Sequence, residues 1–400
     1  MRVHNPPARA ALGLVFCVLL LDVVGISILY PIAAYIVRQY SDDALTLTLL
    51  NALYAAAQFI AAPLLGKLSD RYGRRPVLLA SLLGSALGYM LFGIGGALWV
   101  LFLSRLIDGS TAGNQSVAAA YIADFSTPAT RVKKFTLIGL AWGLGLVLGP
   151  ALGAALGQIN LAAPAFTAAA LALLSLLLCL LALPESLPRE QRTTVALRLT
   201  DLNPFVAIGT MARRPTLGRL LLTLCLFNLA FNGINSTETL YLIDTFAAQP
   251  QQIGALLVLA GIAVMLVQRS IPPLVRRFGE QRLAGAALIG QALGAVATII
   301  MPILWPIYLL VVLRTIASSI SFPTLGTLMV NRVVPREQGT LMGVTTALSS
   351  LMGALGPLWA GAAYDHVASN APYWLGAGVF VFAAATLACV PDRRSARRGS

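Results

Sequence analysis

The chain has 400 residues, of which 58% are hydrophobic and 11% are charged, and its formal net charge is +13. A soluble protein needs far more polar surface than this, so the composition excludes a globular cytosolic protein. The basic residues stand in short clusters between long apolar runs, which argues against a nucleic-acid partner and is typical of the loops of a membrane protein.

Apolar runs of membrane-spanning length follow one another along the whole chain. Each crossing needs about 20 apolar residues, so the sequence predicts an all-α membrane protein with twelve transmembrane helices in two pseudo-symmetric six-helix bundles. The first run continues too far to be a cleaved signal peptide and is predicted to be an uncleaved membrane helix. The predicted spans are residues 10–37, 46–66, 76–95, 98–125, 135–157, 162–184, 219–246, 252–275, 283–303, 306–331, 339–363 and 372–390.

The longest polar stretch lies midway along the chain and divides it into similar halves. We predict an N-terminal six-helix bundle (1–184), a cytosolic linker (185–218), and a C-terminal six-helix bundle with a short cytosolic tail (219–400). Duplicated halves are typical of transporters that bind substrate near the bilayer midplane. Three landmarks recur at nearly constant offset: Arg71-Tyr72-Gly73 as Arg277-Phe278-Gly279, Gly149-Pro150 as Gly356-Pro357, and Arg105 as Arg314.

The basic residues are confined to alternate loops. If residues 66–79 lie in the cytosol, 24 of the 28 lysines and arginines fall on the cytosolic side. Positive charge is enriched on that side of membrane proteins. The sequence therefore predicts that both termini are cytosolic.

Acidic residues inside predicted spans are candidates for proton binding. Asp22 lies near the middle of the first span, where its short side chain cannot reach the interface. Ionisable residues at such a depth usually have a functional role. Glu238 in the seventh span is a second candidate, although a structural acid near the outer surface is an equal alternative.

The charged turn at residues 66–79 joins two uncharged runs. Gly73 suits a backbone conformation that other residues resist, and Pro76 suits the first turn of the next helix. Asp70 stands among four basic residues and can neutralise part of their charge. The alternative is an ordinary basic loop. Against it, many residues with a particular structural role fall within this one short stretch.

This turn resembles the loop signature between helices 2 and 3 of the major facilitator superfamily, and the resemblance covers essentially the whole chain. It implies that the turn locks the halves together in the outward-facing state through a charge relay of Asp70, Arg74 and Asp124. The second copy has Arg276 where the first has Asp70, so a second lock must work differently. The expected conformational-switch residues are Gly66, Asp70, Arg71, Gly73, Arg74 and Asp124.

Two features of the predicted spans resemble proton-coupling sites of this family. Arg105 and Gly109 in the fourth span resemble a helix-4 motif that the family associates with proton coupling, and Asp108 lies on the same helical face as Arg105. A purely structural ion pair is the alternative. Acids in helix 1 are also frequent in the drug–proton antiporters of this family. The expected proton-coupling residues are Asp22, Arg105, Asp108 and Glu238.

Glycines four residues apart in the fifth span allow a neighbouring backbone to approach closely. Simple close packing would explain them, but the pattern also resembles a signature of drug–proton antiporters. The residues of this helix-packing motif are Gly145, Gly149, Pro150 and Gly153.

Polar side chains in several spans are candidates for a substrate cavity. Three asparagines in the seventh span are spaced i, i+4, i+7 and form one stripe, which favours a water-filled cavity. Taken singly, each residue is more often a helix–helix hydrogen bond. The candidates are Gln58, Asn114, Gln115, Trp142, Asn228, Asn232, Asn235, Arg314 and Ser318.

A nucleotide-binding loop, a metal-ligand cluster and a catalytic triad are all missing from the sequence. We therefore predict no cofactor, no metal and no enzymatic activity. The predicted function is secondary active export of apolar or amphiphilic, drug-like small molecules in exchange for protons, by a monomer in the lipid bilayer of a bacterial inner membrane. The alternatives are a lipid or sugar exporter or flippase, a proton-coupled uptake symporter and, from another class, a membrane-embedded enzyme or sensor.

Overall fold

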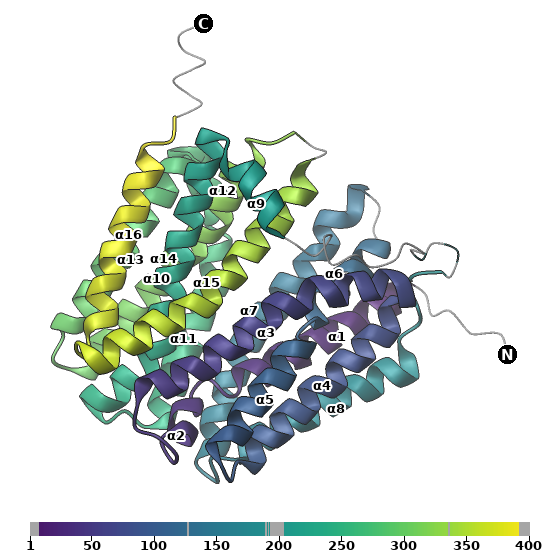
Figure 1. Cartoon of the computed structure of the whole chain (residues 1–400), viewed down its shortest axis with the longest axis horizontal. Helices are drawn as coiled ribbons and strands as arrows, with labels where there is room; N and C mark the ends of the chain where they lie inside the picture. The colour runs from purple at the N-terminus through teal and green to yellow at the C-terminus, as the bar shows by residue number, and fades with distance from the viewer. Residues whose placement is uncertain are drawn as a thin grey trace, which may run out of the picture. The chain divides into compact units, whose positions relative to one another are not determined.

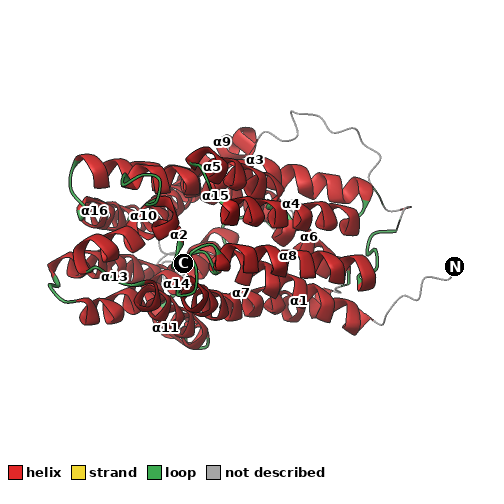
Figure 2. Ribbon diagram, turned by 90° about the horizontal axis from the view of Figure 1, so that it is seen from below, coloured by secondary structure: helices red, strands yellow, loops and turns green. Residues whose placement is uncertain are grey.

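The computed structural model describes residues 8–125, 128–188, 190, 192, 204–334 and 337–391. Within the predicted linker, residues 189, 191 and 193–203 lie outside the described residues. Within the described part, every regular element is helical and none is a strand (Figure 2). The predicted all-α class is confirmed.

The first half of the chain contributes eight of the described helices. Their order and bounds are α1 (Ala8–Ser27), α2 (Ala33–Val37), α3 (Ala44–Tyr72), α4 (Arg74–Ile94), α5 (Leu98–Thr111), α6 (Asn114–Asp124), α7 (Pro128–Gly157) and α8 (Ala163–Ala182).

The second half contributes eight more described helices. These are α9 (Pro204–Ala212), α10 (Pro215–Phe246), α11 (Pro250–Gln268), α12 (Ile271–Phe278), α13 (Glu280–Ile300), α14 (Leu304–Val330), α15 (Gln338–His366) and α16 (Ala371–Ala388). Ten helices in the described part are long and apolar enough to cross a membrane.

Three predicted spans are interrupted, which corrects the expectation of continuous helices. The span 10–37 breaks between α1 and α2 at Pro31, since proline cannot donate the helical N–H bond. The span 98–125 breaks between α5 and α6 at Gly113, where a Cβ would lie 2.6 Å from Leu65 Cδ1. The span 252–275 breaks between α11 and α12, just before Pro272 and Pro273.

The chain separates into two compact units by Cα proximity. Unit 1 comprises residues 1–42, 53–202 and 249–261, and unit 2 comprises residues 43–52, 203–248 and 262–400. The predicted bundles are each one continuous stretch of the chain. The two units are not continuous, because residues 43–52 group with unit 2 and residues 249–261 with unit 1. In Figure 1, α1, α4, α5 and α8 lie side by side in unit 1, as α10, α13, α14 and α16 do in unit 2.

Each unit has its own apolar core. In unit 1, Leu19 of α1 and Leu82 of α4 are buried with Tyr121 of α6. In unit 2, Phe227 of α10 and Phe380 of α16 pack with their ring centroids 6.2 Å apart. These cores fix the faces of the helices that carry the buried polar residues.

Candidate functional site

A buried acid links α1 to the broken fourth span in unit 1. Asp22 is 7% exposed, and its Oδ1 accepts a hydrogen bond of 2.7 Å from Nδ2 of Asn114. Asn114 is the first residue of α6, directly after the break at Gly113. The break therefore places this amide beside the carboxylate.

An arginine and a second acid lie on α5. Arg105 Nη1 is 3.5 Å from Asp108 Oδ2, and Asp108 is 2% exposed. Ser85 of α4 also hydrogen-bonds to Asp108. The Arg105 guanidinium lies 4.6 Å from the centroid of Phe92, so an aromatic ring also faces the cation. Its Nε and Nη2 atoms have no hydrogen-bond partner among the described residues.

These acids line one polar cleft of unit 1. Its volume, ≈ 10 Å³, is about what one water molecule needs. Of the predicted cavity and proton-coupling residues, the structure brings five together here, whereas Trp142 of α7 is not among the lining residues. The cleft is lined by Asp22, Ile26, Tyr54, Gln58, Ser85, Asp108, Ala112, Asn114 and Gln115.

The other predicted acid, Glu238, belongs to unit 2 and has an arginine of its own. Arg314 Nη1 of α14 lies 2.9 Å from Glu238 Oε1 of α10. The two residues are 5% and 8% exposed, so this is a buried ion pair. The Arg314 guanidinium also lies 5.5 Å from the ring centroid of Tyr373 on α16.

The asparagine stripe on α10 is partly satisfied by its own helix. Asn228 donates to the carbonyl of Leu224, and Asn232 donates to the carbonyl of Asn228. Asn235 is exposed. Ser318 of α14 is likewise bonded within its helix, to the carbonyl of Thr315. The stripe thus runs from a buried position to an open one.

The charged turn is tighter than predicted. Lys67 to Arg71 lie on the last turns of α3, and α4 begins at Arg74, so Gly73 alone joins the two helices. Its φ of 109° is in a region that L-residues avoid.

Arg74 is the centre of the side-chain network at this turn. Arg74 contacts Asp70 of α3 across the Gly73 turn, and its Nε is 3.2 Å from Asp124 Oδ2 at the end of α6. Ser69 accepts a further bond of 2.7 Å from Nη1 of Arg74. The three residues of the expected charge relay therefore lie in contact.

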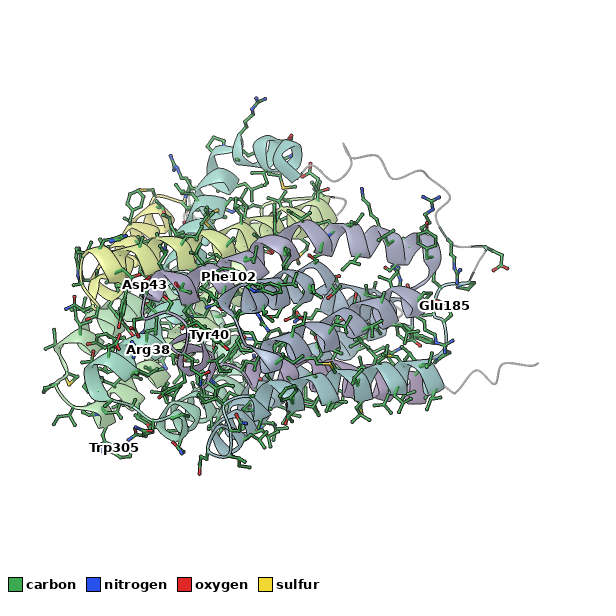
Figure 3. All side chains as sticks on the ribbon, turned by 60° about the horizontal axis from the view of Figure 1, so that its bottom comes forward. Arg38, Tyr40, Asp43, Phe102, Glu185 and Trp305 are labelled. Atoms are coloured by element: carbon green, nitrogen blue, oxygen red, sulfur yellow. The ribbon has the colours of Figure 1, made fainter. Side chains whose placement is uncertain are left out.

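Sequence reasoning missed two residues of this network. The Glu185 carboxylate accepts hydrogen bonds from the backbone N–H groups of Arg74 (2.8 Å) and Arg75 (3.3 Å). Ser186 donates to Asp124 over 2.7 Å. Figure 3 places Glu185 at the end of unit 1 far from Tyr40. The run Pro184-Glu185-Ser186, where the sixth span meets the linker, shows polar residues at a helix end. Its sequence does not predict that these residues contact the turn at Gly73.

The second copy keeps the geometry of the turn and changes its chemistry. Gly279, with φ of 83°, alone joins α12 to α13. The next residue is Glu280 where the first copy has Arg74, and Asn331 at the end of α14 donates to it over 3.3 Å. A neutral amide thus replaces the carboxylate of Asp124.

The glycines of α7 bring that helix against α1. Ser27 Oγ donates to the carbonyl of Gly145 over 2.9 Å. A Cβ at Gly149 would lie 3.0 Å from the backbone N of Ile28, and one at Gly153 would overlap the carbonyl of Ile28. The predicted close approach therefore occurs between α7 and α1.

Comparison with known proteins fits this architecture. The sequence model of the Major Facilitator Superfamily matches residues 15–357 and 273–400. The chain is 36% identical to the class C tetracycline resistance protein of Escherichia coli, over 94% of each protein. It is 31% identical to the class B tetracycline resistance protein of Escherichia coli, over 89% of this chain and 88% of that one.

Solved structures share the fold. The crystal structure of the human organic anion transporter MFSD10 aligns with a TM-score of 0.73 and 27% identity, over 96% of this chain and 100% of that one. The nucleoside transporter NupG aligns at 0.78 with 16% identity, over 95% and 98%, which is a likeness of fold alone. The predicted twelve-helix, two-bundle class is confirmed, and the protein is a multi-pass membrane transporter and not an enzyme. The chain belongs to the Major Facilitator Superfamily.

Proposed function

We propose that this transporter exports amphiphilic, drug-like small molecules in exchange for protons by alternating access. The observation that carries the proposal is the pair of buried carboxylates, Asp22 and Asp108, which line one polar cleft while Arg105 is paired with Asp108. Asp108 is paired with Arg105, whereas Asp22 is held by the neutral amide of Asn114. A buried carboxylate without a counter-charge in a membrane is stabilised by taking up a proton.

The roles follow from the contacts. Asp22 is the proton carrier and is held by Asn114. The Arg105–Asp108 pair on α5 responds electrostatically when Asp22 gains or loses its proton. Gln58 and Gln115 line the same cleft and offer hydrogen bonds to a substrate. Arg74, Asp70 and Asp124 act on conformation and not on the substrate, because they lie at the helix ends.

The relatives named tetracycline resistance proteins support export of a drug-like substrate. We propose that the protein works as a monomer in the bacterial inner membrane, with both termini in the cytosol. The basic turns at residues 66–79 and 276–282 support this orientation.

Reconstituted vesicles with an imposed pH gradient test the proposal, with tetracycline as the first substrate probe. The wild type should move tetracycline against the direction of proton flow. Asp22→Asn should abolish gradient-driven transport and retain exchange without a gradient. Asp42→Asn is the matched control, because Asp42 is an exposed acid in the same unit. Unchanged gradient-driven transport in Asp22→Asn would remove Asp22 from the mechanism.

A further inference from the structure

Unit 2 contains a buried cluster of polar side chains around Arg314. The Glu238 carboxylate is the acid paired with it, at 2.9 Å. Gly294 of α13 provides the room for the arginine, because a Cβ there would lie 2.5 Å from Arg314 Cγ. Gln291 lies one turn before Gly294 on α13 and is 2% exposed, and Tyr373 is fully buried.

Several hydrogen-bond donors of this cluster have no acceptor among the described residues. Arg314 Nε, Gln291 Nε2 and Tyr373 OH are buried and have no hydrogen-bond partner among the described residues. The first two are donors only, and a phenol can donate. A buried donor without an acceptor is destabilising, so three of them in one unit need an explanation. A ligand that brings acceptor oxygens would satisfy them.

The balance of charge differs from that of unit 1. There, two carboxylates, Asp22 and Asp108, line one cleft, and Arg105 is paired with Asp108. Among the described residues of unit 2, Glu238 is the one acid that forms an ion pair with Arg314. The cleft of unit 1 therefore suits a proton or a cation, whereas the Arg314 cluster of unit 2 holds a neutral ion pair with unmet donors and suits an anionic oxygen.

We infer that Arg314 is a binding site for the acidic oxygen of an organic anion, and that Glu238 is the internal anion which this ligand displaces. The site needs no cavity beforehand, because the departing carboxylate vacates the space beside the guanidinium. Asn235, one turn before Glu238 on α10, is exposed. The inference rests on the proposed function, since it names a chemical group of the transported substrate.

Binding to the detergent-purified full chain tests the inference without any proton gradient, so a failure of proton coupling would not affect it. The probes are 2-naphthoate and 2-naphthamide, which match in shape and differ in charge. We expect naphthoate to bind about 10- to 100-fold more tightly, as one charge-assisted hydrogen bond allows. Glu238→Gln should raise the affinity for naphthoate about tenfold, because the competing anion is removed.

Arg314→Gln should abolish the preference for naphthoate. Because that change leaves Glu238 buried without a partner, the double variant Glu238→Gln/Arg314→Gln provides a folded, neutral site that should bind both probes equally. Arg282→Gln, an exposed arginine of α13, should leave the preference unchanged. Equal binding of the two probes by the wild type, or a preference that survives in the double variant, would overturn the inference. Displacement of naphthoate by equimolar chloride would overturn the assignment to an organic anion.

Discussion

The carboxylate of Glu185 occupies the place where any side chain on residue 73 would have to stand. A Cβ added at Gly73 would overlap Oε2 of Glu185 and would lie 2.8 Å from Nη2 of Arg192. The same carboxylate accepts the backbone N–H groups of Arg74 and Arg75, the first two residues of α4. Because the N-terminus of a helix carries partial positive charge, this acid caps α4 as well as packing on the turn.

Gly73→Ala should destabilise the protein for two reasons. The φ of 109° is strained for alanine, which costs about 1–3 kcal/mol, and the methyl group would push Glu185 from the end of α4. The apparent melting temperature in detergent should fall. Gly66→Ala is the control on the neighbouring helix α3, because a Cβ at Gly66 meets nothing within 4 Å.

Truncating Glu185 in the same background separates the two effects. The double variant Gly73→Ala/Glu185→Ala removes the overlap and keeps the strained backbone, but it also loses the cap of α4. Its melting temperature should therefore lie below that of Glu185→Ala alone. Equal values for these two variants would show that the conformation of residue 73 carries no cost.

Asp70→Asn should change the balance of conformations and leave the substrate affinity of each conformation nearly unchanged. The change weakens the contact with Arg74, which also reaches Asp124 and Ser69. Alkylation rates of single cysteines on opposite faces of the membrane would report the shift. Because Asp70 is half exposed, the free-energy change should be modest, about 1 kcal/mol or less.

A double-variant cycle with Arg74→Gln controls for simple unfolding. Once the arginine is gone, Asp70→Asn should have little further effect on the alkylation rates. A large loss of intrinsic substrate affinity in Asp70→Asn would contradict a purely conformational role.

The sequence predicted contacts within one helix better than contacts between helices. Arg105 and Asp108 are three residues apart on α5, so helical periodicity alone brings them together. Asp70 and Arg74 lie on either side of the one-residue turn at Gly73 and are neighbours through that turn. The Glu238–Arg314 pair joins positions 76 residues apart. Periodicity shows which face of a helix a residue occupies, but which helix faces it depends on packing of the whole unit.

The fold was predictable to a similar extent. Twelve apolar runs were visible because loops carry the charges, whereas the breaks in three of them were not. Pro31 and Gly113 were present in the sequence, but proline and glycine also occur in continuous membrane helices. The break before α6 matters because it sets Asn114 beside Asp22, a contact between helices that periodicity does not predict.

Gly149→Ala should disrupt the packing of α7 on α1. The added methyl group would overlap Ser27 Oγ and stand 3.0 Å from the backbone N of Ile28. Overpacking of this kind costs about 1–3 kcal/mol, and backbone cannot move aside as a long side chain can. Thermal unfolding measures the loss, and Gly139→Ala on the same helix is the control, because a Cβ there meets nothing within 4 Å. Equal melting temperatures for the two variants would contradict close approach of the helices.

In unit 2, Asp365 near the end of α15 caps the start of α3. Its Oδ1 accepts the backbone N–H of Ala44 at 2.9 Å, and its Oδ2 accepts that of Leu45 at 2.7 Å. Gly361, one turn earlier on α15, lies so close to Thr48 that a Cβ would overlap Thr48 Oγ1. Asp365→Ala should therefore cost about 0.5–2 kcal/mol, as the loss of a helix cap does. Asp365→Asn should recover part of the loss, because its amide oxygen still accepts one N–H, and hydrogen exchange at residues 44–48 would locate the opening. If exchange there stayed as slow in Asp365→Ala as in the wild type, the start of α3 would be held by its packing against α15 and not by the cap.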